Sequence, residues 1–96
     1  MDESLKEQIL ALAAAELRRM GRNEEIELSL VDGDNFKGRL GMLYDVQNSI
    51  PADFPKGHWI VYLRYSNRGE IGPSTIMAFA KKSLEMVYFG SANDEG

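Results

Sequence analysis

The sequence has no cysteine and a single histidine, His58, among its 96 residues. Without cysteine the chain can form no disulfide, thiolate nucleophile or Cys-based metal cluster, so its core must come from side-chain burial. His58 precedes Trp59 in an apolar segment, and we interpret it as a residue at the start of a strand; a general base is the alternative. No P-loop and no G-x-S-x-G nucleophile elbow occurs. We therefore predict no catalytic residue, no metal ligand and no cofactor.

Basic residues are outnumbered, with 11 Lys and Arg against 15 Asp and Glu and a net charge of −4. Nucleic acid is bound through clustered cations, so we do not expect it as a partner. Arg18, Arg19 and Arg22 lie close together, and we place them at a helix C-terminus, where the helix dipole favours cations; a local nucleic-acid patch is the alternative.

Long apolar runs are also lacking. The apolar segment 9–17 is shorter than the roughly 20 residues that span a bilayer. The charged residues Glu7 and Glu16 flank it. The N-terminus lacks the positive start of a signal peptide. We expect a cytoplasmic protein with no membrane partner.

The clearest local pattern is a helix from the N-cap Ser4 to Gly21. Ser4 and Glu7 fit a capping box, and glycine commonly follows the last helical turn. Apolar residues recur at helical spacing along one face. They are Leu5, Ile9, Leu12, Ala13, Leu17 and Met20.

After residue 24 the pattern favours strands. Alternating or β-branched and aromatic residues predict strands at 26–30, 36–46, 58–65, 74–80 and 84–89, the last ended by Gly90. Asp32-Gly33-Asp34-Asn35 is predicted to be a turn, with a calcium loop as the weaker alternative. Short connections favour an antiparallel meander. We predict an α+β fold, an N-terminal helix packed on an antiparallel sheet of about five strands, in one domain (1–90) with a polar tail (91–96).

The distribution of aromatic residues suggests where this protein binds. Strand alternation places Trp59 and Tyr65 opposite Tyr62, so both sheet faces carry aromatics, whereas one helix covers one face. Loop 47–57 also contains Phe54, which either packs on the core or meets a partner. A surplus of apolar area marks an interface or a groove. The candidate binding residues are Tyr44, Phe54, Trp59, Tyr62 and Tyr65.

The C-terminal half resembles small bacterial immunity-type domains of the YrhB-like kind. Three segments carry this resemblance. Segment 59–62 matches a tryptophan-bearing strand, segment 72–76 a glycine-led strand, and segment 82–90 a lysine turn followed by a final strand. Leu84 stands where the family has a glycine. The resemblance implies binding and neutralising a toxin. The chain also looks like the small, acidic, often self-associating orphan proteins of mobile integron cassettes.

These observations favour a non-enzymatic binding module. We expect it to form a homo-oligomer, with a dimer as the first expectation, and to engage a protein partner. A small-molecule-binding domain is the alternative, with a pocket between helix and sheet or at a subunit interface, opened by Gly38 and Gly41 and lined by Trp59 or Tyr44. An enzyme that uses no recognisable motif is the third alternative.

Overall fold

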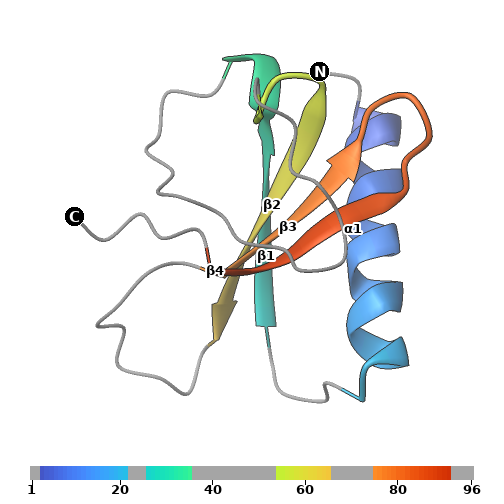
Figure 1. Cartoon of the computed structure of the whole chain (residues 1–96). Coiled ribbons are helices and arrows are strands. Elements are labelled where there is room, and N and C mark those ends of the chain that lie inside the picture. The colour runs from blue at the N-terminus through green and yellow to red at the C-terminus, as the bar shows by residue number, and fades with distance from the viewer. Residues whose placement is uncertain (1–2, 22–25, 36–53, 66–74, 92–96) are drawn as a thin grey trace.

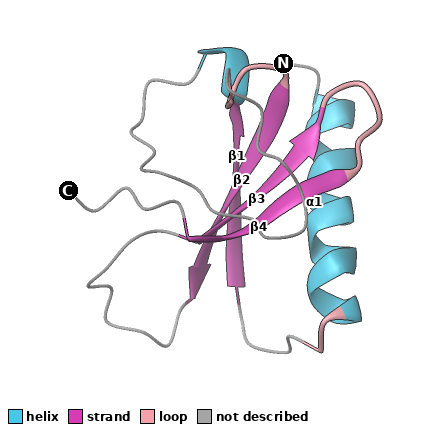
Figure 2. Ribbon diagram, in the orientation of Figure 1, coloured by secondary structure: helices cyan, strands magenta, loops and turns pink. Residues whose placement is uncertain are grey.

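The computed structural model describes residues 3–21, 26–35, 54–65 and 75–91. One helix, α1 (Glu3–Arg19), precedes four strands: β1 (Ile26–Asp32), β2 (His58–Tyr65), β3 (Thr75–Ala80) and β4 (Met86–Ser91). A 3-10 turn, η1 (Gly33–Asn35), follows β1. Figure 1 and Figure 2 show α1 lying along one face of the sheet. The predicted α+β class is confirmed.

The sheet is an antiparallel meander in the order β1-β2-β3-β4. Its register pairs Leu30 with Val61 and Val61 with Met77, so β2 lies between two neighbours. The described residues form four strands rather than about five. The strand predicted at 36–46, which would carry Tyr44, lies outside the described residues.

The element boundaries mostly follow the sequence pattern. β2 covers the predicted range 58–65, and Gly21 follows α1 with a positive φ of 75°. The helix starts at Glu3, one residue before the predicted N-cap Ser4, so Ser4 lies in its first turn. β4 starts at Met86 and not at residue 84. Pairing with β3 continues through Gly90, so this glycine does not end the strand.

The main core lies between α1 and the sheet. Buried Ile9, Ala13 and Leu17 recur every four residues and form the helix face that meets the sheet. Alternate positions of β2 and β3 complete this cluster. They are Trp59, Val61, Leu63, Met77 and Phe79.

The centre of the second face of the sheet is also buried, whereas Glu27, Ser29 and Arg64 at its β1 side are exposed. Ile60, Ile76 and Ala78 are 0% exposed, and they form a separate cluster with Tyr88, against which Phe54 packs. Fully burying one such aliphatic side chain is worth about 1.5–3 kcal/mol. Aromatics do lie on both faces, and Phe54 of the loop packs on the second face, so no wide apolar surface is left open at its centre. The apolar centre of this face therefore offers no open binding surface.

Candidate functional site

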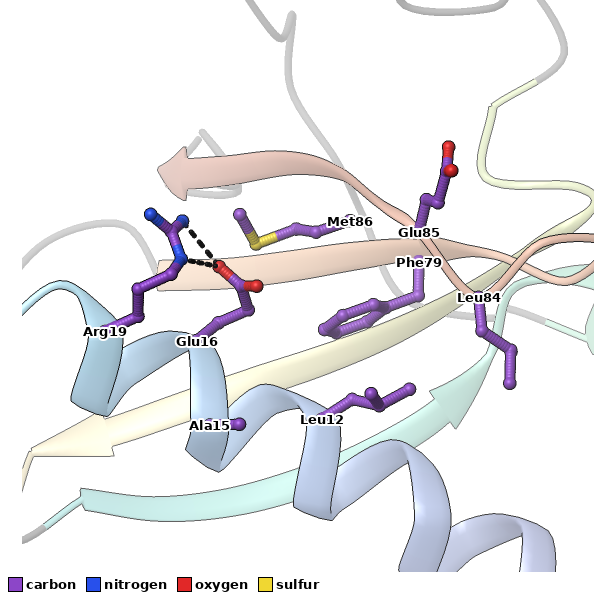
Figure 3. A pocket seen from close by; sticks show the side chains of 8 residues that line it. All are labelled: Leu12, Ala15, Glu16, Arg19, Phe79, Leu84, Glu85 and Met86. Atoms are coloured by element: carbon purple, nitrogen blue, oxygen red, sulfur yellow. Dashed lines mark hydrogen bonds and ion pairs between the residues drawn. The ribbon is translucent and has the colours of Figure 1, made fainter.

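A groove of about 500 Å³ lies between α1 and the hairpin of β3 and β4 (Figure 3). We call it the α1–β4 groove. Its apolar lining comes from both sides, with charged residues among it. The lining residues are Leu12, Ala15, Glu16, Arg19, Phe79, Leu84, Glu85 and Met86.

The helix side of the groove is a stripe of residues three or four positions apart. Leu12, Ala15, Glu16 and Arg19 share this stripe because such spacing places side chains on one helix face. It runs beside the stripe that enters the main core. Ala15 is exposed and carries only a methyl group, so the helix fills little of the space above Phe79.

The sheet side of the groove depends on the β3–β4 turn. The amide of Leu84 donates to the carbonyl of Ala80 at 2.8 Å, and the amide of Ala80 donates to the carbonyl of Glu85 at 3.0 Å. Leu84 has a φ of 60°, a left-handed conformation that costs a non-glycine residue about 1–2 kcal/mol. Its side chain packs against the main core. This burial offsets the strain and sets Leu84 and Met86 in the groove wall.

Three charges border the groove. The Arg19 guanidinium donates from Nε (3.0 Å) and Nη2 (2.6 Å) to Oε2 of Glu16, one helical turn earlier. This ion pair raises the pKa of Arg19, through the hydrogen bond and then the charge of Glu16. Glu85 is exposed on the turn across the groove. The groove thus has an apolar lining and a rim with a formal charge of −1, from two Glu and one Arg.

A second polar cluster, the Lys81 clamp, ties together three segments at one end of the sheet. Lys81 Nζ donates to Asp32 Oδ1 and to Asp34 Oδ2, each at 2.6 Å. The same ammonium lies 4.3 Å from the centre of the Trp59 ring, at a cation–π distance. Asp34 Oδ1 accepts from the Gly57 amide at 2.8 Å, and the Lys81 amide donates to the Gly57 carbonyl at 3.0 Å.

The clamp shifts the pKa values of all three ionisable members. The hydrogen bond from Lys81 lowers the pKa of Asp32 and, aided by the Gly57 amide, that of Asp34. Burial acts to lower the pKa of Lys81, but the hydrogen bonds to Asp32 and Asp34 outweigh it and the pKa is raised. All three groups are therefore held in their charged forms at neutral pH.

The turn before β2 packs closely under the clamp. Gly33 is buried, and a Cβ there would collide with the carbonyl oxygens of Pro55 and His58, so only glycine fits this approach. The His58 ring lies 5.0 Å from the Phe54 ring, and its Nδ1 is 2.9 Å from the Lys56 carbonyl. His58 begins β2, as predicted.

The clamp carboxylates already have a cation. Lys81 forms ion pairs with both Asp32 and Asp34. Their arrangement therefore stabilises the fold and leaves no carboxylate open to bind a metal ion. In the described ranges, no group of three or more His, Cys, Asp or Glu is placed to hold a metal ion. The chemistry that the α1–β4 groove offers is contact with an apolar group and charge pairing at its rim.

The five candidate binding residues do not meet in one site. Trp59 is 7% exposed and belongs to the main core, beneath Lys81. Phe54 and Tyr62 are half-buried on the opposite face of the sheet. Tyr44 and the side chain of Tyr65 lie outside the described residues. None of the described candidates lines the α1–β4 groove.

Sequence reasoning missed both the groove and the clamp. The apolar spacing on α1 predicted only the face that meets the sheet, whereas the groove uses the neighbouring residues Leu12 and Ala15. Lys81 and Asp34 are 47 positions apart, and nothing in either turn indicates that the two meet. That contact follows from the sheet register, which places Asp32 beside Trp59.

Comparison with protein-family models, curated proteins and solved structures finds no match for this chain. The resemblances to YrhB-like immunity domains and to integron-cassette proteins therefore stay predictions. Among the described residues, no helix is long and apolar enough to cross a membrane.

Proposed function

We propose that this chain is a non-enzymatic interaction module that self-associates, engages a protein partner and acts in the cytoplasm. The observation that carries the proposal is the α1–β4 groove, an open apolar hollow with charges at its rim. Protein interfaces combine an apolar centre with a polar border in this way. Both sheet faces bury residues within the chain itself, so the groove replaces the uncovered face as the proposed contact surface.

Light scattering at high micromolar concentration tests self-association, with two matched variants on the same helix. Ala15 lines the groove and Ala11 does not, while both are exposed on α1. Ala15→Glu adds a second uncompensated carboxylate to an acidic groove and should dissociate the oligomer, because identical grooves then repel. Ala11→Glu should leave it intact. A monomeric wild type, or equal effects of the two variants, would contradict the proposal.

The protein partner is proposed to be basic, because this chain is acidic. A toxin bound by an immunity-type domain of this charge would be such a partner. Acidic surfaces steer basic partners, and this attraction weakens as salt screens it. Association with a candidate basic toxin should therefore slow markedly between low and physiological ionic strength. An association rate that does not change with salt would count against this part of the proposal.

A small-molecule-binding domain is the second candidate function, and the size of the groove favours it. Ligand pockets commonly enclose about 300–1,000 Å³, and this groove of about 500 Å³ lies between helix and sheet. A thermal-shift screen against metabolites tests it, because a bound ligand raises the melting temperature by mass action. A hit should be lost in Ala15→Phe, which fills the groove, and kept in Ala11→Phe. A broad library without a hit would count against this function.

A further inference from the structure

The charges around the α1–β4 groove include a cation with donors to spare. The Arg19 side chain is 66% exposed, and two of its N–H groups reach one oxygen of Glu16. A guanidinium carries further N–H donors in the same plane, which can pair with a second carboxylate. Arg19 is therefore only partly satisfied within its own chain.

The same groove carries a carboxylate, that of Glu85, for which the described part of the chain supplies no cation. Glu85 is exposed on the β3–β4 turn, and its side chain makes no ion pair with any of the described residues. Figure 3 shows Arg19 and Glu85 at opposite ends of the groove, one from the helix and one from the turn, with Phe79 between them. One groove thus presents a guanidinium with spare N–H donors and, across an apolar centre, a carboxylate with no ion pair among the described residues.

We infer that the occupant of the α1–β4 groove is the same groove of a second copy, in a two-fold dimer in which Arg19 of each copy pairs with Glu85 of the other. This inference rests on the proposed self-association and names its surface. A two-fold contact uses one patch twice, so a patch with a cation at one end and an anion at the other complements itself. The methyl group of Ala15, within this patch, lets the two surfaces approach.

The charge arrangement favours a second copy over a uniformly basic partner segment. A basic segment would satisfy Glu85, but at the other end of the groove it would have to compete with Arg19 for Glu16. A second copy satisfies both ends at once and leaves the apolar residues Leu84 and Met86 facing apolar residues of the partner. The dimer contact therefore occupies the groove, and a basic partner would compete with it.

A charge-swap series tested by sedimentation equilibrium decides this inference. Arg19→Glu and Glu85→Arg each place like charges together at both symmetry-related contacts and should weaken the dimer by about tenfold or more. The double variant Arg19→Glu with Glu85→Arg restores opposite charges across the contact and should regain part of the lost affinity, because the new carboxylate at position 19 also lies beside Glu16. Arg18→Glu is the matched control, because Arg18 is exposed on the same helical turn but does not line the groove.

The outcomes separate this inference from the proposed function. A wild-type dimer that both single variants leave unchanged, or a double variant that regains none of the affinity lost in the single variants, overturns the Arg19–Glu85 contact while self-association stands. A wild type that is monomeric at high micromolar concentration overturns both. Circular dichroism of each variant establishes that it is folded, and Glu85→Arg, on an exposed turn, tests the contact even if Arg19→Glu lowers helix stability.

Discussion

Replacing Lys81 by methionine should destabilise this fold more than any other single charge removal on the β3–β4 turn. Lys81 holds two carboxylates and lies over Trp59, so the substitution removes two ion pairs and one cation–π contact together. Methionine keeps an apolar stem of similar length against the Trp59 ring. The loss is therefore one of charge and hydrogen bonding, with little loss of packing.

The expected loss of stability in Lys81→Met follows from how far Lys81 and its two carboxylate partners are exposed. The Lys81 and Asp32 side chains are 25% and 26% exposed, so their pair lies near the upper end of the about 0.2–1 kcal/mol measured for exposed pairs. The cation–π contact adds about 0.5–1 kcal/mol. The more exposed Asp34 adds less than Asp32. We expect Lys81→Met to lower the free energy of unfolding by about 1–2 kcal/mol, or the melting temperature by about 4–16 °C in a domain of this size.

Urea denaturation followed by far-ultraviolet circular dichroism measures this loss without relying on Trp59 emission, which the substitution itself alters. Lys82→Met is the matched control, because Lys82 is the exposed next residue and surface substitutions of this kind stay within about 0.5 kcal/mol. If the two variants unfold at the same urea concentration, the clamp contributes nothing measurable and the reasoning from its geometry is refuted.

Three further predictions concern acid, backbone strain and the second core. The folded-state pKa values of Asp32 and Asp34 lie below their ordinary 3.8, so the clamp's contribution is complete above that value and disappears as pH falls through the folded-state values. Urea titrations from pH 7 to 2 should then show the wild type losing its advantage over Lys81→Met below about pH 4, and parallel curves would contradict this. Leu84→Gly should be more stable than Leu84→Ala by about 1 kcal/mol in denaturation experiments. Both variants lose the leucine side chain, but only glycine is unstrained at this φ. An alanine variant that is more stable than the glycine variant would refute this prediction. Ile60→Ala should lower the free energy of unfolding by about 2–5 kcal/mol in the same assay, as expected for a fully buried side chain. A loss below about 1 kcal/mol would mean that this face of the sheet is open to solvent.

The elements that could be predicted from sequence are those set by local patterns. Apolar spacing at the helical period predicts α1, and a near-continuous run of β-branched and aromatic residues at 58–65 predicts a central strand that is buried on both faces. Leu84 shows where local reasoning ends. Its apolar side chain suggested the start of a strand, but the turn holds its backbone in a left-handed conformation and β4 starts two residues later.

Both sites depend on contacts between distant residues, and that is why the sequence did not reveal them. Trp59 was expected to mark a binding surface because aromatic residues often do. In the fold, Lys81 lies over its ring, and Trp59 is buried in the same cluster as the apolar face of α1. The sequence correctly placed aromatics on both faces but could not show that Phe54 packs against the second buried cluster, which contains Ile60.

The clamp and the groove share one turn, and this links stability to binding. Lys81 begins the β3–β4 turn and is fixed by Asp32 and by the Gly57 carbonyl, while Leu84 and Glu85 end the same turn as part of the groove wall. A turn anchored at its start loses less conformational freedom when its end is immobilised in a contact, so less binding energy is spent on ordering it. Lys81→Met should therefore weaken self-association even though Lys81 does not line the groove. Lys82→Met, in the same turn but outside the clamp, should not.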